Sequence, residues 1–193
     1  MELSVKNIKY NSKAISEKAF SEHFELYKGY VNKFNAITNE LSAEYNTQDA
    51  NSTYSKFRAL KKGESYALDG AVLHELYFQA MTASETRPLP KTIDIISKSF
   101  GSFSNFVDDF INTAKSARGW VIFSLDQRTG TFRNFLLDSH DNGIVLMAFP
   151  IIVIDMYEHA YFLDYGINKE AYIRSFMKSI NWDLVEKQIK KLC

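Results

Sequence analysis

Asp155 and His159 lie four positions apart directly after an apolar run, and their types and spacing are suited to metal chemistry. The run, residues 149–154, reads Phe-Pro-Ile-Ile-Val-Ile and has the length and branched side chains of a buried strand. A carboxylate and an imidazole at the end of one strand can point to the same place. Such oxygen and nitrogen ligands suit a first-row transition metal. The spacing D-x-x-x-H also arises by chance, so it needs support from elsewhere in the chain.

Two more histidines, His23 and His74, provide that support. Each lies on the apolar face of a predicted helix. A single histidine in such a place is more often a hydrogen-bonded core residue than a ligand, but here two helices each offer one inward imidazole. Three neutral imidazoles and one carboxylate carry a single negative charge, which suits Fe or Mn in the 2+ and 3+ states. Structural zinc is less well matched, because such sites favour cysteine. We expect one ion per chain.

The elements that must position these residues begin with a helix over residues 15–44. Phe20, His23, Tyr27, Tyr30 and Phe34 recur in steps of three and four and therefore share one face. Ser16 is the expected N-cap.

A second helix is predicted over residues 64–81, with His74 on its inner face. Residues 45–63 are mostly polar, with a short separate helix expected around Phe57. Two of the three prolines fall in residues 82–90, which predicts a linker and a boundary between domains at 1–85 and 86–193.

The second half of the chain mixes helical and β patterns, which predicts an α+β fold. An N-terminal helical hairpin would pack on a C-terminal lobe containing helices and a three-stranded antiparallel sheet. The expected helices are 90–99, 104–116, 169–180 and 183–192, and the expected strands are 120–125, 131–137 and 149–155.

Composition excludes several kinds of partner. The 23 basic and 23 acidic residues cancel, so neither nucleic acid nor an anionic membrane is expected to bind. The longest apolar run is much shorter than the ~20 residues that span a bilayer. The single cysteine, Cys193, allows no internal disulfide, and no apolar signal sequence is visible at the N-terminus. We therefore expect a cytoplasmic protein.

The segment Asp155-Met-Tyr-Glu-His-Ala-Tyr-Phe-Leu-Asp-Tyr165 resembles the signature of the iron/manganese superoxide dismutases. The likeness extends over nearly the whole chain. Residues 15–35 and 70–78 are similar to the first two helices of that family, and Phe100-Gly-Ser-Phe103, Gly119-Trp120 and Asn181-Trp-Asp183 are similar to its later segments.

The resemblance implies a metal held by His23, His74, Asp155 and His159. Tyr30 resembles the tyrosine at the mouth of the substrate funnel, and Trp120 a tryptophan that lines the cavity. His140 stands where the family places a side chain that contacts metal-bound solvent, and Gly70 would leave space for it. Tyr157 occupies a site position that is usually tryptophan.

One spacing departs from the family pattern. His23 lies seven positions before Tyr30, where the family usually shows eight, and eight positions would make Glu22 the ligand. Seven steps on a regular helix come to almost two turns, so His23 and Tyr30 share a face. We prefer His23 for this reason.

The resemblance also implies a homodimer in which Glu158 bonds the partner's last ligand histidine. Tyr27 and Phe162 stand near two positions that meet across the family's interface. The implied activity is the dismutation of superoxide to oxygen and hydrogen peroxide, with Lys28, Lys33 and Lys169 as candidates to attract the anion. The alternative is a metal-binding protein on the same scaffold with little or no such activity.

Overall fold

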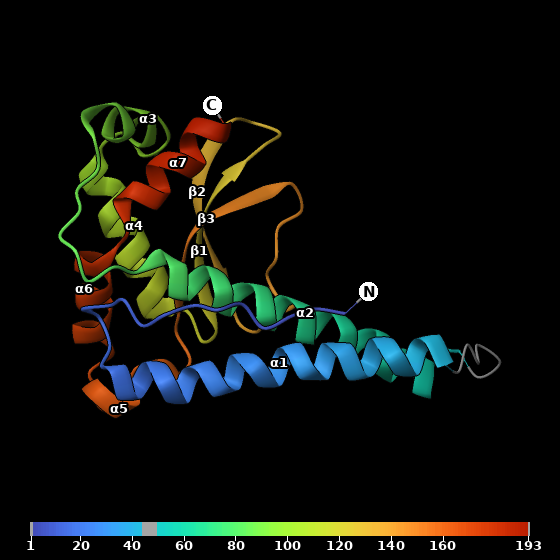
Figure 1. The fold of residues 1–193 in the computed structure, drawn as a ribbon. Coiled ribbons are helices and arrows are strands. Elements are labelled where there is room, and N and C mark those ends of the chain that lie inside the picture. The colour runs from blue at the N-terminus through green and yellow to red at the C-terminus, as the bar shows by residue number, and fades with distance from the viewer. Residues whose placement is uncertain (1, 44–49, 193) are drawn as a thin grey trace.

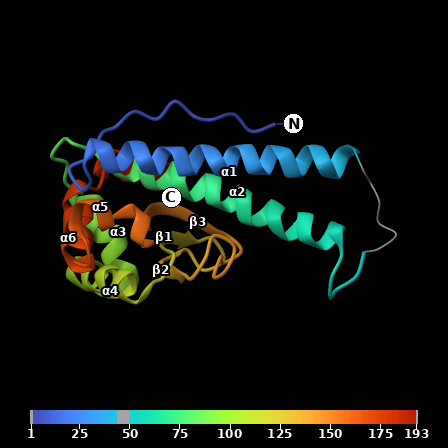
Figure 2. The ribbon, with the colours of Figure 1, turned by 90° about the horizontal axis from the view of Figure 1, so that it is seen from below.

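The computed structural model describes residues 2–43 and 50–192, and its most prominent feature is a pair of long antiparallel helices (Figure 1). Helix α1 (Glu17–Ala43) and helix α2 (Lys56–Ala80) lie side by side and extend well beyond the rest of the fold, as Figure 2 also shows. The side chain of Ser16 accepts a hydrogen bond from the backbone of Ala19 at 3.1 Å, as expected of a cap on α1.

Helix α2 begins earlier than predicted. The side chain of Ser55 accepts a hydrogen bond from the backbone N–H of Arg58 at 3.0 Å and so caps a single helix that runs through Gly63. The expected separate short helix around Phe57 is therefore wrong, because these residues form the first turns of α2. Of the polar segment 45–63, residues 45–49 lie outside the described residues, as does Cys193.

The second half contains the predicted mixture of helices and strands, gathered at one end of the hairpin (Figure 2). Its helices are α3 (Pro90–Phe100), α4 (Phe103–Ser116), η1 (Glu158–Ala160), α5 (Phe162–Tyr165), α6 (Lys169–Ser179) and α7 (Trp182–Leu192), and its strands are β1 (Trp120–Asp126), β2 (Thr131–Leu137) and β3 (Ala148–Asp155).

The three strands form one antiparallel sheet in the order β2-β1-β3, as predicted. Central strand β1 is buried along its whole length, and its first residue, Trp120, pairs with Leu137 on one side and Asp155 on the other. Strand β3 accommodates Pro150 because it is an edge strand and because the β1–β3 register shifts beside that residue. The sheet thus places Asp155 at the end of its edge strand.

A single cluster of buried hydrophobic residues joins the hairpin to the sheet and its helices. An isolated bridge between Met81 and Ile180 further ties the end of α2 to the C-terminal part of the chain. The predicted α+β fold class is confirmed, whereas the domain boundary near residue 85 stays a prediction. Within the described residues, no helix is both long and apolar enough to cross a membrane.

Candidate metal centre

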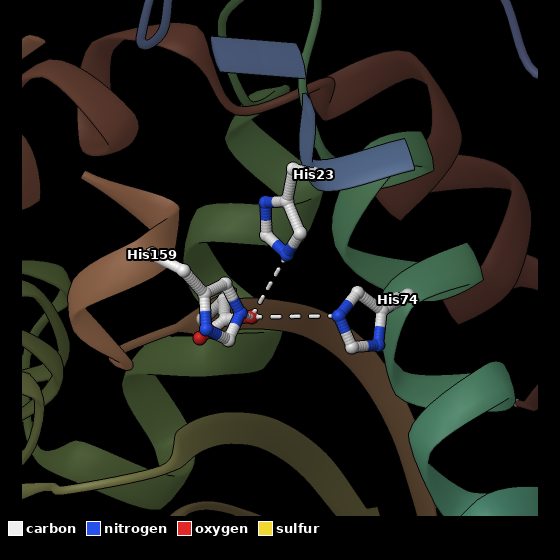
Figure 3. Close-up of side chains that lie close together, drawn as sticks. His23, His74 and His159 are labelled. Atoms are coloured by element: carbon white, nitrogen blue, oxygen red, sulfur yellow. Dashed lines mark hydrogen bonds and ion pairs between the residues drawn. The ribbon is translucent and has the colours of Figure 1, made fainter. Parts of the chain in front are cut away.

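Four side chains from four separate elements converge on one point. His23 comes from α1, His74 from α2, Asp155 from the end of β3 and His159 from η1. One ligand atom from each of them lies within 4.8 Å of the corresponding atoms of the others. Figure 3 shows the three imidazoles around the carboxylate. The Asp155 Oδ2 atom lies 3.2 Å from Nε2 of His23, 3.2 Å from Nε2 of His159 and 3.9 Å from Nε2 of His74.

The backbone around Asp155 fixes the direction of its carboxylate. The N–H group of Tyr157 donates to Asp155 Oδ1 at 2.8 Å, which leaves Oδ2 to face the imidazoles. The hydroxyl of Tyr172 donates to the backbone oxygen of Asp155 at 2.9 Å and holds the end of the strand from behind. One turn of 3-10 helix then brings His159 back to the same carboxylate.

The buried imidazoles have nitrogen atoms with no hydrogen-bond partner. His74 Nδ1 lies 2.6 Å from the backbone oxygen of Gly70, and because that oxygen can only accept, Nδ1 carries the proton. The lone pair of His74 is therefore on Nε2, which faces the cluster and makes no hydrogen bond. Neither ring nitrogen of His23 makes one. Because an unpaired buried polar atom costs about 1–3 kcal/mol, the cluster fits a bound metal ion.

Burial keeps the imidazoles in the form that metal binding requires. It lowers the pKa of His74 to about 3 and also lowers the pKa of His23. Burial alone would raise the pKa of Asp155, but the interactions with His159 and His23 outweigh it and hold that pKa below its ordinary value. The neutral imidazoles of His23 and His74 and the ionised carboxylate of Asp155 are ready to bind a cation without first losing protons.

The four candidate ligands differ in exposure. His23, His74 and Asp155 are buried, whereas the side chain of His159 is 33% exposed. The neighbouring Glu158 is exposed as well. Any burial of the Glu158 carboxylate therefore has to come from a second chain.

The structure brings His23, and not Glu22, into the cluster. Glu22 is exposed and does not belong to the cluster. Helix α1 is continuous over this stretch, and the aromatic ring of Tyr30 packs 5.2 Å from the ring of His74. Seven helical steps therefore place His23 and Tyr30 on the same side, as the spacing predicted.

His140 lies beside the cluster and links two of the predicted site residues. Its Nδ1 atom accepts a hydrogen bond from the indole N–H of Trp120 at 2.9 Å, so its other nitrogen, Nε2, faces the hydroxyl of Tyr30 at 2.7 Å. His140 is buried, and its ring centre is 5.9 Å from that of His74. The ring of Tyr157 stacks on His159 with centres 5.3 Å apart.

The space beside Gly70 is filled by Tyr30. A Cβ atom on Gly70 would meet Cδ1 of Tyr30 at 2.8 Å. The expectation that this space accepts His140 is therefore corrected: the missing side chain admits the Tyr30 ring, which in turn contacts His140.

Tyr66 is a neighbour of the site that the sequence analysis missed. Its ring centre lies 4.6 Å from that of His140 and 6.1 Å from that of Tyr30. The available signal was its position one helical turn before Gly70, on the same face of α2.

The expected interface residues have different surroundings. Tyr27 is 0% exposed, and its hydroxyl accepts from the backbone of Lys6 and donates to Glu75. Both of these hydrogen bonds are formed within the chain and not across an interface. Phe162 is 52% exposed. A contact between Tyr27 and Phe162 across two chains stays a prediction.

Of the three lysines considered for attracting an anion, Lys33 lies next to the site. With Tyr30 and Tyr66 it lines an open groove of about 440 Å³ between α1 and α2. Lys28 instead pairs with Glu25, and Lys169 donates to the backbone oxygens of Lys115 and Ala117.

Comparison with known proteins identifies the family. Residues 88–188 match the family model described as iron/manganese superoxide dismutases, C-terminal domain. A protein named as an iron superoxide dismutase from Aquifex pyrophilus is 38% identical over 186 residues, which cover 94% of this chain and 87% of the relative. A protein named as manganese superoxide dismutase 1 from Halobacterium salinarum is 32% identical over 171 residues, which cover 88% of this chain and 84% of the relative. The chain thus belongs to the iron/manganese superoxide dismutase family.

Proposed function

We propose that this chain is a superoxide dismutase that converts superoxide to oxygen and hydrogen peroxide with one Fe or Mn ion. The observation that carries the proposal is the convergence of His23, His74, Asp155 and His159, with buried imidazole nitrogens left unpaired. These four side chains would hold the ion. When bound, it would supply one-electron chemistry by cycling between its 3+ and 2+ states. Relatives named for iron and for manganese are both found, so either metal agrees with the comparisons.

The chain's own residues keep the ligand geometry fixed. Gly70 holds the His74 ring through its backbone oxygen, and Tyr157 and Tyr172 hold Asp155 from two sides. Such outer contacts orient metal ligands and adjust their basicity. The negative charge of Asp155 lowers the net charge of the site and thereby favours the 3+ over the 2+ state.

His140 and Tyr30 are the residues placed to handle protons. Peroxide formation takes up two protons for each molecule released. Because Trp120 donates to Nδ1 of His140, the other nitrogen, Nε2, carries the imidazole proton and donates to the Tyr30 oxygen at 2.7 Å, which leaves the Tyr30 hydroxyl free to donate its own proton. Trp120 donates to the other nitrogen of His140 and keeps the ring from turning. Burial raises the pKa of Tyr30, so this phenol stays protonated and able to donate at neutral pH.

Attraction of the substrate must be local because the net charge is zero. Lys33 is the best placed cation for this role, since it lines the groove that also reaches Tyr30.

Two finer features belong to the proposal. The first is a homodimer in which Glu158 bonds His159 of the other chain; the exposure of both residues supports it. The second is a cytoplasmic location, supported by the single cysteine of the chain.

The test is to purify the protein from its native source, measure Fe and Mn, and assay superoxide dismutation. We expect about one ion per chain and an activity that is lost on removing the ion and recovered on returning it. A protein that binds the ion but does not accelerate dismutation would overturn the proposed activity and leave the metal site standing.

A further inference from the structure

Tyr66 reaches from a buried imidazole to the surface. Its ring lies closer to His140 than any other ring in the described residues, with centres 4.6 Å apart. Tyr66 is 37% exposed, whereas His140 is 1% exposed. Tyr66 is therefore in contact with both the buried imidazole and solvent.

Three phenol rings surround His140. The ring centres of Tyr66, Tyr30 and Tyr157 lie 4.6, 4.7 and 5.4 Å from that of the imidazole. The rings of Tyr66 and Tyr30 are also neighbours, with centres 6.1 Å apart. The buried imidazole thus lies among three phenol rings.

Two of these phenol rings face the open groove between α1 and α2. Tyr66 and Tyr30 line the groove together with Gly29 and Gly63, which lack side chains that would narrow it. A Cβ atom on Gly29 would meet nothing within 4 Å, and one on Gly63 would approach Ile37 at 3.1 Å. Water in the groove therefore has direct access to the exposed face of Tyr66.

We propose that Tyr66 is a positioning residue for the dismutation: its ring shields His140 from solvent, and its hydroxyl joins Tyr30 and His140 to the water of the groove. This inference rests on the proposed function. Tyr30, whose oxygen accepts a hydrogen bond from His140 Nε2–H, gives its own proton to the forming peroxide. Tyr66 replaces that proton, and the water of the groove replaces the proton that Tyr66 gave. Every phenol returns to its neutral form, so the path carries protons without consuming a residue.

Two substitutions separate the ring from the hydroxyl. Tyr66→Phe keeps the shield and removes the hydroxyl, whereas Tyr66→Leu removes both. Tyr54→Phe is the matched control, because Tyr54 is 86% exposed and is not a site residue. All variants are made in the full chain, and their metal content is measured before any assay.

The kinetic arm tests the path for protons. We expect Tyr66→Phe to lower kcat by about threefold or more while kcat/KM changes by less than about twofold, because proton supply limits turnover and not encounter. Ammonium ions added as a small proton donor should restore kcat. The Tyr54→Phe variant should match the parent protein in both constants.

A second experiment, on hydrogen exchange, tests the shielding role and needs neither metal nor activity. The chain has only two tryptophans, and the indole N–H of Trp120 donates to His140. In metal-free protein, exchange of this N–H with solvent is followed by NMR, with the indole of Trp182 as an internal reference. We expect Tyr66→Leu to speed exchange at Trp120 about tenfold or more, with Tyr66→Phe and Trp182 unchanged.

The two arms also separate this inference from the proposed function. A Tyr66→Phe variant with unchanged kcat, or with a loss that ammonium does not restore, would overturn the proton path. If Tyr66→Phe lowers kcat and kcat/KM equally and also loses metal, Tyr66 has only a structural role, and the proton path is overturned as well. If the parent protein binds metal but is inactive, the proposed function fails, and unaltered exchange at Trp120 in Tyr66→Leu would then overturn the shielding role.

Discussion

His140 Nε2 lies 2.7 Å from the hydroxyl of Tyr30, although 110 residues separate the two in the chain. The contact joins a loop after strand β2 to the middle of helix α1. Both residues lie next to the cluster of His23, His74, Asp155 and His159 without belonging to it. The pair therefore offers a way to change activity without removing the metal.

We expect His140→Ala to keep about one metal ion per chain and to lower dismutation about tenfold or more, with an altered pH profile. The reason is that His140 bonds only Trp120 and Tyr30 among the site residues. Elemental analysis and the dismutation assay measure the two effects. Tyr30→Phe, which removes the other half of the bond, should likewise keep the metal. Loss of metal from His140→Ala would show that His140 is itself a ligand.

Substitution of a candidate ligand, unlike substitution of His140 or Tyr30, should remove the metal. We expect His23→Ala and Asp155→Ala to lose tight metal binding, because each removes one of four ligand atoms that lie within 4.8 Å of one another. Glu22→Ala is the matched control, since Glu22 is adjacent to His23 but exposed. Dialysis against a weak chelator followed by elemental analysis measures retention. If His23→Ala kept its full metal content, or if Glu22→Ala lost the metal, Glu22 and not His23 would be the ligand from α1.

Much of this site could be predicted from the sequence because its ligands lie at positions with strong local patterns. Asp155 and His159 follow a clear strand, and His23 and His74 fall on apolar helix faces. The role of Gly70 could not be predicted, because the space beside it is filled by Tyr30 from another helix. Tyr66 was missed for the same reason: its contacts with His140 depend on how α2 meets the loop after β2.

The helices and strands likewise divide into those whose bounds depend on local sequence and those whose bounds depend on tertiary packing. Strand β2 has the predicted bounds and α4 begins one residue earlier than predicted, because the β-rich and amphipathic patterns of these segments are local. The start of α2 was predicted too late, because the polar residues before Glu64 look like a loop when taken alone. The Ser55 cap starts the helix at Lys56, and packing of the hairpin supports its first turns against α1.

Acid should destabilise the metal-free protein over a defined range. Burial lowers the pKa of His74 from 6.5 to about 3, so below pH 6.5 the unfolded chain binds a proton that the folded chain does not. Stability is then complete above pH 6.5 and falls as the pH decreases toward 3, by about 3 kcal/mol from His74 alone at pH 4. The lowered pKa of His23 acts in the same direction.

Urea unfolding of metal-free protein between pH 8 and pH 4 measures this dependence. The curve should be level from pH 8 to about 7 and then decline. A free energy of unfolding that stays constant down to pH 4 would contradict the assignment of His74 as a buried neutral imidazole.

Glu158 should affect assembly more than folding. It is exposed in the single chain, so Glu158→Gln should leave the thermal stability of each chain nearly unchanged. If it bonds His159 of the other chain, the substitution should weaken the dimer by about tenfold in Kd or more, because the bond occurs twice across a two-fold axis. Sedimentation of dilute samples measures Kd, with Asp108→Asn as an exposed control. Equal dissociation constants for parent and variant would exclude the contact.

Gly70 provides a test of the packing that places Tyr30. A Cβ atom at this position would lie 2.8 Å from Cδ1 and 3.0 Å from Cγ of the Tyr30 ring, so Gly70→Ala must push that ring away. We expect a loss of about 1–3 kcal/mol in stability from overpacking, despite the higher helix propensity of alanine. Activity should also fall, because the displaced Tyr30 hydroxyl loses its bond to His140.

Gly29→Ala is the matched control for that substitution. Gly29 also lies within a helix, but a Cβ atom there would meet nothing within 4 Å. Alanine at this position should therefore stabilise the protein by about 0.5–1 kcal/mol through helix propensity alone. Thermal unfolding, metal content and dismutation are measured for both variants. Opposite signs of the stability change, with metal retained in both, are the expected outcome, whereas a stabilised and fully active Gly70→Ala would show that the Tyr30 ring does not depend on the missing side chain.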